Sequence, residues 1–129
     1  MSTEVYMSTT DESIEQETQA KGLTAPRVTP ADIEANIAGE HYFTAAKGAY
    51  RDGPWAMGET GPFGEKGRKT LCVLVLRNGF TVTGESACAS HENFDAEIGR
   101  KIARENAVQK IWPLMGYELR SKLAAEAAE

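Results

Sequence analysis

Hydrophobic and polar positions change their spacing along the chain, and each change predicts a different element. Residues 1–28 are rich in Ser, Thr, Glu and Gln and have no apolar period, which predicts a disordered acidic tail. The pattern becomes helical at Thr29, which can cap a helix that begins with Pro30, so a short helix is predicted over 30–38. Residues 41–50 then carry the aromatic side chains and the threonine typical of a strand.

The clearest alternation surrounds an Asn-Gly dipeptide, the pair preferred at tight hairpin turns. Strands are predicted on either side of it, at about 70–77 and 80–87. A two-residue turn would place Val75 opposite Val82. The first strand is apolar on both sides, so it is predicted to be central in its sheet or covered on both faces.

A helical period returns at about residue 94 and continues to Ile111. The Trp112-Pro113 pair is predicted to end this helix, because the residue before a proline disfavours helical geometry. A second, short helix is predicted from about 116 to 125.

On a helical wheel the first of these helices has two apolar stripes. Large side chains form one stripe and small residues form the other, roughly opposite: Phe94, Ile98, Ile102 and Val108 against Ala96, Gly99, Ala103 and Ala107. One stripe can pack on the sheet of the same chain, so the other predicts a second surface. With few elements available, we expect that surface to be another copy of the chain.

Together these elements predict an α+β fold. A small antiparallel sheet built around the hairpin packs with the long helix at 94–111 and with short flanking helices. The chain has 129 residues, enough for one domain, which we place at 29–129. Within it, residues 51–69 hold five glycines and two prolines, so a long glycine-rich loop is predicted there.

The charge distribution narrows the classes of partner. The formal net charge is −5, which argues against general binding of nucleic acid. Between residues 98 and 110, however, four basic residues stand against one acidic residue, a local basic strip that suits a small anionic ligand. No apolar run approaches the ~18 residues of a membrane span, and the N-terminus shows no signal peptide. A cytosolic protein with reduced thiols is therefore expected.

The basic strip supplies the main candidate site. Arg100 and Arg104 are four residues apart, so they share one face of the helix. Arginine offers paired donors that match phosphate oxygens, and the start of a helix adds free backbone N–H groups. The further candidate residues are Lys101 in the strip and Asn93, Phe94 and Asp95 at the helix start. Two alternatives stay open: a solvated face balanced by Glu97, and Phe94 as a core residue.

Catalytic and metal chemistry is weakly supported. Cys88 and His91, with Cys72 and His41 added, could form a zinc site, but zinc sites usually show two tight ligand pairs and only one loose pair exists here. A Cys88/His91 nucleophile pair rests on spacing alone. No phosphate-binding loop of the Walker type is present. We therefore predict a binding protein, not an enzyme, with no metal and no cofactor.

Residues 72–120 carry longer motifs that resemble a known family. They read NGF-x-V-x-G-E-S-A-C, then E-N-F-D-x-E-I-G, then A-x-x-x-A-x-x-x-I-W-P-L-x-G-Y, and the upstream segment IEANIAGEHYFTA is also similar. The resemblance is to the phage protein family named after phage N4 Gp49 and phage Sf6 gene 66. It implies a phage or prophage origin and a location in the cytoplasm of a bacterial host.

The resemblance extends to the first type of Thoeris anti-defence proteins. These are sponges that sequester the cyclic ADP-ribose isomers made by TIR enzymes and do not cleave them. Some also hold cyclic di- or trinucleotides from CBASS signalling at a separate site. They are homo-oligomers, up to hexamers, with ligand held between subunits.

For this chain the resemblance implies a pyrophosphate contact at Arg100 and Arg104. It implies base or ribose contacts at Phe94, Asn93 and Asp95. The alternative expectation is a phage accessory protein that binds a host protein through the second face of the helix, with no small ligand.

Overall fold

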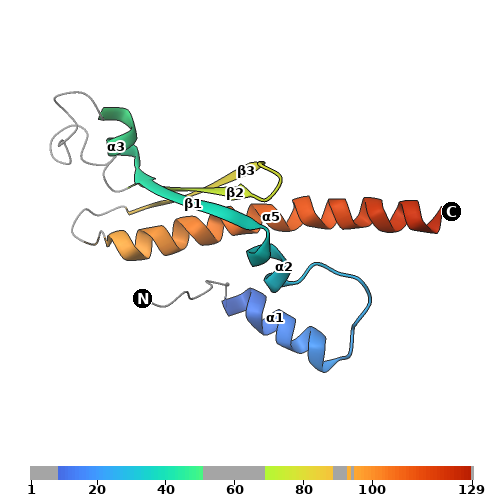
Figure 1. Ribbon diagram of the computed structural model, residues 1–129. Coiled ribbons are helices and arrows are strands. Elements are labelled where there is room, and N and C mark those ends of the chain that lie inside the picture. The colour runs from blue at the N-terminus through green and yellow to red at the C-terminus, as the bar shows by residue number, and fades with distance from the viewer. Residues whose placement is uncertain (1–8, 51–68, 89–92, 94, 129) are drawn as a thin grey trace.

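One antiparallel sheet and one long helix form the centre of the molecule. The strands lie in the order β1-β2-β3, with β1 at Ile37–Thr44, β2 at Lys69–Leu76 and β3 at Thr81–Ala87. The long helix α5 (Ala96–Ala127) runs along one face of this sheet and continues past its edge (Figure 1). The predicted α+β fold is confirmed. This computed structural model describes residues 9–50, 69–88, 93 and 95–128.

The described residues before the hairpin form three shorter helices: α1 (Thr9–Ala20), α2 (Pro30–Ala35) and α3 (Ala45–Tyr50). The helix α1 differs from the disorder predicted for residues 1–28. Acidic residues in its first turn suit the positive end of the helix dipole. Polar contacts hold α1 to the rest of the chain. Its sequence therefore needs no apolar period, which is why the helix was not predicted.

The start of α2 agrees with the sequence, but its end does not. Thr29 caps the helix, and its side chain accepts a hydrogen bond from the backbone N–H of Asp32. The helix ends at Ala35 instead of 38, because β1 begins two residues later. The strand predicted over 41–50 likewise ends early and gives way to α3.

The hairpin forms as predicted, but its register is shifted by one residue. Leu74 lies opposite Val82, where Val75 was expected. The turn holds three residues instead of two: the backbone N–H of Leu76 donates to the carbonyl of Phe80, and Gly79 adopts a φ of 89°. Such a turn ends in a left-handed residue, which glycine adopts without strain.

The shift reverses the two faces of β3. A one-residue slip moves every side chain of a strand to the other face. Val82 and Gly84 therefore face α5 together with Leu74, whereas the predicted register put them on the opposite face. β2 is the central strand, as predicted.

The helix α5 is continuous through Pro113, so the predicted break and separate second helix are wrong. Proline removes one hydrogen bond from a helix interior and crowds the preceding turn. Here the proline is exposed, while its neighbours Trp112 and Met115 pack against the core. That packing, with good helix formers on both sides, holds the helix together across the proline.

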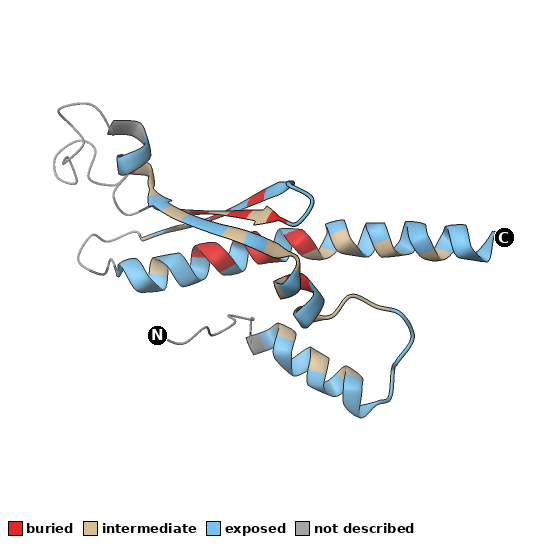
Figure 2. Ribbon diagram, viewed as in Figure 1, coloured by how far each residue is buried: buried red, intermediate tan, exposed pale blue. Residues whose placement is uncertain are grey.

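The core lies between α5 and the covered face of the sheet (Figure 2). Small residues of α5 make this contact: a Cβ at Gly84 would lie 2.1 Å from the carbonyl oxygen of Ala103 and 2.3 Å from the backbone nitrogen of Ala107. The small stripe therefore faces the chain's own sheet. The buried hydrophobic residues of the cluster are Ile33, Cys72, Leu74, Leu76, Val82, Ala103, Ala107, Val108 and Ile111.

The large stripe of α5 is divided. Val108 is buried, but Ile98 and Ile102 are 56% and 45% exposed. Beyond Met115 the helix extends away from the sheet, and most of its residues there are exposed (Figure 2). The predicted contact with another copy stays a prediction, and Ile98 and Ile102 are the residues of the large stripe available for it.

Candidate anion-binding site

A small cavity lies between the first turns of α5 and the junction of β1 with α3. Its volume is about 150 Å³, and both Arg100 of α5 and Lys47 of α3 line it. The other lining residues are aromatic, hydroxyl-bearing or small: Tyr42, Phe43, Thr44, Thr70 and Ala96. The cavity therefore brings cations, hydroxyls and rings together at one place.

Local packing places Arg100 at this cavity. Thr44 and Thr70 are paired across β1 and β2, and Thr70 is buried beneath α5. A Cβ at Gly99 would lie 2.9 Å from Thr70 Oγ1. The helix can approach the sheet this closely because residue 99 has no side chain, and the next residue, Arg100, then reaches the rim.

The end of β1 places Lys47. The backbone N–H of Lys47 donates to Thr44 Oγ1 at 3.2 Å, so the threonine that ends the strand also caps the first turn of α3. The lysine consequently projects from the start of α3, beside the side chains at the end of β1.

Among the residues that the structure describes, the charged side chains lining the cavity are both positive. Among the described residues, neither the Arg100 guanidinium nor the Lys47 ammonium forms an ion pair. The described residues that line the cavity include no carboxylate. Two cations near each other in such a site favour an anion, and the planar donors of arginine suit phosphate oxygens.

Arg104 lies one turn further along α5 in a different environment. It is only 5% exposed. Its Nη1 and Nη2 donate to Glu34 at 3.0 and 2.7 Å, and its Nε and Nη2 donate to Glu40 at 2.9 and 3.1 Å. Burial disfavours the charged guanidinium, but these carboxylates raise the pKa of Arg104 above its ordinary value. Arg104 was predicted to hold a phosphate, whereas here its guanidinium binds α2 and β1 to α5.

The same network reaches one wall of the cavity. The Tyr42 hydroxyl donates to Glu40 Oε1 at 2.7 Å. Hydrogen bonds from Arg104 lower the pKa of Glu40, whereas burial and the nearby carboxylate raise the pKa of Tyr42. Burial also raises the pKa of Cys72 to about 11, so this cysteine keeps its proton near neutral pH.

The other predicted site residues lie elsewhere. Asp95 caps α5 by accepting from the backbone N–H of Ile98 at 3.0 Å, and together with Asn93 it lines a separate cavity of about 140 Å³. Lys101 is exposed and pairs with Glu97 at 3.5 Å. Phe94 lies outside the described residues. Those predicted residues that the structure describes therefore do not lie in one site of a single chain.

Sequence reasoning missed the contribution of β1 and α3 to the cavity, above all Lys47. Residues 41–50 were predicted as one strand, so the change from β1 to α3 after Thr44 was not predicted. A threonine followed three residues later by a lysine in an alanine-rich run was the available signal, since Thr44 caps α3 as Thr29 caps α2.

The described residues show neither a metal-binding cluster nor a membrane-spanning helix. They contain no group of three or more His, Cys, Asp or Glu residues placed to hold a metal ion. The suggested pair of Cys88 with His91 cannot be placed, since His91 lies outside them. No described helix is both long and apolar enough to cross a bilayer.

The fold and this cavity define a small α+β protein with a site suited to an anion. The chain belongs to the phage protein (N4 Gp49/phage Sf6 gene 66) family, whose model matches residues 28–123. The match includes the whole sheet and most of α5. No curated protein and no solved structure matches the chain.

Proposed function

We propose that the protein is a phage anti-defence sponge. It binds and sequesters cyclic nucleotide immune signals, above all the cyclic ADP-ribose isomers made by TIR enzymes, without cleaving them. Cyclic di- and trinucleotides, which carry negatively charged phosphodiester groups in place of a pyrophosphate, form the second ligand class of the proposal. Membership of a phage protein family supports it, together with the resemblance to the Thoeris anti-defence proteins.

The observation that carries the proposal is the cavity lined by two cations, neither of which forms an ion pair with another described residue. Arg100 supplies paired donors for phosphate oxygens, and Lys47 supplies a point charge from the other side. The ring of Phe43 is 40% exposed at the same cavity, which leaves a surface for a base or ribose. Arg104, with both sides of its guanidinium occupied by carboxylates, has no part in ligand binding under this proposal.

The size of the cavity implies that one chain holds only part of the ligand. Small-molecule pockets usually measure about 300–1,000 Å³, and this cavity has about 150 Å³. We propose that a second copy covers the rest, in a homo-oligomer of up to six subunits. Ile98 and Ile102 supply exposed apolar area for that contact. The assembly acts in the cytoplasm of the bacterial host, where the signals are made.

Isothermal titration against a panel of cyclic ADP-ribose isomers and cyclic di- and trinucleotides tests the proposal. We expect at least one ligand to bind, and Arg100→Ala and Lys47→Ala each to weaken it by about tenfold or more, since a hydrogen bond to a charged group contributes about 1.5–3 kcal/mol. Arg120→Ala is the matched control, because it removes a charge from an exposed part of α5 far from the cavity.

Recovery of the bound ligand distinguishes a sponge from an enzyme. Heating the loaded protein should release the ligand chemically intact. Hydrolysed product would overturn the sponge, and a flat titration for the whole panel would overturn ligand binding.

The alternative function is binding of a host protein through the exposed face of α5, with no small ligand. The exposure of Ile98 and Ile102 favours it. Ile98→Ser with Ile102→Ser should then abolish capture of the host protein without changing the titrations. If the same change dissociates a homo-oligomer instead, the face belongs to the contact between copies.

A further inference from the structure

The helix α1 lies outside the residues that match the family, yet it docks on the part that does match. The match begins at residue 28, after α1 and most of its connector. Asp11 of α1 nevertheless contacts α5 near the middle of that helix. The question is what the surface beneath α1 recognises.

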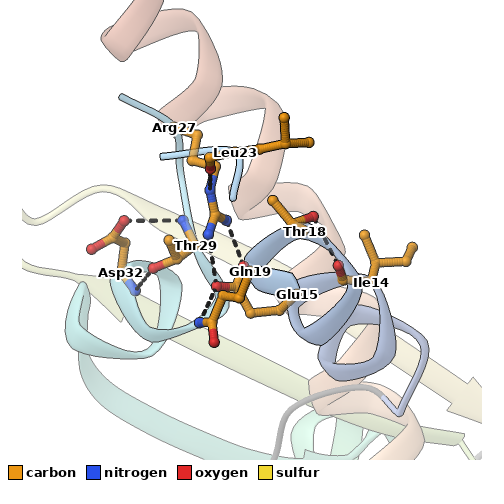
Figure 3. A network of polar contacts seen from close by, with 8 residues as sticks. All are labelled: Ile14, Glu15, Thr18, Gln19, Leu23, Arg27, Thr29 and Asp32. Carbon is orange, nitrogen blue, oxygen red and sulfur yellow. Dashed lines mark hydrogen bonds and ion pairs between the residues drawn. The ribbon is translucent and has the colours of Figure 1, made fainter. Parts of the chain in front are cut away.

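The surface presents hydrogen-bond donors from two parts of the chain. On α5, Gln109 Nε2 and Trp112 Nε1 donate to the same oxygen of Asp11, Oδ2, at 3.0 and 3.3 Å. On the connector, Arg27 donates to both oxygens of Glu15, at 2.5 and 2.9 Å (Figure 3). We call Arg27, Gln109 and Trp112 the α1 docking site.

The docking site matches an acidic helix in spacing. Asp11 and Glu15 are four residues apart, so they project from one face of α1, and each is bound by a different part of the site. Charge complementarity is strongest at Glu15, where the Arg27 guanidinium lowers the pKa of the carboxyl group to about 2. The surface therefore recognises two carboxylates at helical spacing.

The fit of α1 to this site is polar and incomplete. Ile14, between the two acidic residues in sequence, is 57% exposed. A cavity of about 320 Å³ remains along the helix, walled by Val28, Pro30 and Trp112. The contacts that hold α1 are polar: the Arg27–Glu15 pair, whose side chains are 30% and 16% exposed, and the hydrogen bonds to Asp11. The helix α1 is consequently held much less firmly than the core elements.

The connector would let α1 leave without disturbing the core. Residues 21–26 are exposed throughout, and Gly22 within them has a φ of 67°. Val28, directly after Arg27, packs against the core, so the backbone beside Arg27 is anchored by contacts that do not involve α1.

We propose that Arg27, Gln109 and Trp112 form a docking site for a short acidic helix, occupied here by the chain's own α1 and open to exchange with the α1 of a second copy. The same contacts form in either case, since the two helices are identical, and exchange of identical elements is a low-cost route to association. The proposal does not depend on ligand binding at Arg100 and Lys47.

A labelled peptide of residues 7–22, which stands in for the α1 of a second copy, tests the site. The partner is the full chain with Asp11→Ala and Glu15→Ala, whose own α1 cannot compete while its docking site is intact. We expect fluorescence anisotropy to show binding that weakens as salt is raised. The wild-type chain, whose site is filled, should bind the peptide more weakly.

Two peptide variants make the result specific. A peptide with Asp11→Ala and Glu15→Ala should bind about tenfold more weakly or worse, because it loses the charge-assisted hydrogen bonds. A peptide with Glu12→Ala and Glu17→Ala has the same net charge as the Asp11→Ala, Glu15→Ala peptide, because each loses two carboxylates. It should nevertheless bind like the original peptide, since it keeps Asp11 and Glu15. Glu17 pairs with Lys21, just after the end of α1, and the Glu12 carboxylate forms no ion pair or side-chain hydrogen bond with another described residue.

Arg27→Ala with Gln109→Ala, added to the full-chain variant, should abolish binding of the original peptide. Equal binding by the two double-variant peptides, or none up to millimolar concentration, would overturn the proposal. The proposal would also be overturned if the wild-type chain bound the peptide as tightly as the Asp11→Ala, Glu15→Ala chain does. The peptide would then bind outside the α1 docking site.

Discussion

Arg100 and Arg104 occupy the same face of α5, one helical turn apart, and have opposite surroundings. Arg104 is enclosed by the carboxylates of Glu34 and Glu40, whereas Arg100 lines a cavity whose described walls hold a second cation and no carboxylate. The helix gives both side chains the same direction. The difference comes from β1, which offers Glu40 beside one arginine and Thr44 beside the other. Position on a helix therefore does not decide whether an arginine can bind a ligand. The residues that face its side chain decide it.

Removal of each arginine should separate these roles most strongly. Arg104→Ala leaves two carboxylates next to a buried vacancy and should lower the free energy of unfolding by about 3–5 kcal/mol. Arg100→Ala removes an exposed side chain and should change it by less than about 0.5 kcal/mol. Urea denaturation of both variants measures the contrast. Similar losses for the two would mean that Arg100 is also structural.

The close approach of α5 to the sheet gives the next largest effect. At Gly84 an added Cβ meets backbone atoms of Ala103 and Ala107, which flank the turn that carries Arg104. Gly84→Ala should therefore cost about 1–3 kcal/mol, the usual range for overpacking. Gly79→Ala is the control, because an alanine there strains the backbone without crowding any neighbour: residue 79 has open space around it and a φ of 89°.

Thermal unfolding of both variants, followed by circular dichroism, measures the difference. Overpacking at Gly84 should also disturb the position of α5, so near-UV ellipticity should fall in Gly84→Ala and be retained in Gly79→Ala. An unaltered melting temperature for Gly84→Ala would contradict the packing described here.

Acid should act on the Arg104 network and leave the Arg100 site unaffected. Hydrogen bonds from Arg104 hold the pKa of Glu40 below its ordinary value of 4.5. A lowered folded pKa means that the pair stabilises the protein above about pH 4.5 and loses this contribution as the pH falls through the folded value. Stability should therefore fall between pH 5 and pH 3, less steeply in Glu40→Gln than in wild type.

Urea midpoints at each pH measure these slopes. Arg100→Ala serves as the matched control and should keep the wild-type slope, because Arg100 has no carboxylate partner among the described residues. An identical slope for Glu40→Gln and wild type would remove Glu40 from the account of acid sensitivity.

The features that the sequence predicted correctly are those set by neighbouring residues. The cap of α2 at Thr29, the existence of the hairpin and the shared face of Arg100 and Arg104 all follow from spacing within a few positions. The hairpin register was wrong because it depends on the conformation of one residue. Gly79 takes a positive φ at the third position of the turn, and the dipeptide alone also fits a two-residue turn.

The site was harder to predict because its partners are far apart in sequence. Glu40 and Glu34 precede Arg104 by 64 and 70 residues, so nothing local shows that they neutralise it. Lys47 lines the same cavity as Arg100 only because β1 pairs with β2 in one register and α5 crosses the end of that pair. The continuity of α5 past Pro113 is another long-range effect, since packing of Trp112 and Met115 opposes the local preference.

The smallest expected effect concerns Lys101, the basic neighbour of Arg100 on the exposed side of α5. It pairs with Glu97 at 3.5 Å, and both side chains are largely exposed. Exposed pairs four residues apart on a helix contribute about 0.3–0.5 kcal/mol, so Lys101→Ala should lower the free energy of unfolding by no more than that. Its effect on ligand titration should stay below about twofold, against about tenfold for Arg100→Ala. A tenfold loss for Lys101→Ala would move the anion site around the helix, away from β1 and Lys47. The contrast between Arg100 and Arg104 would then no longer explain where the ligand binds.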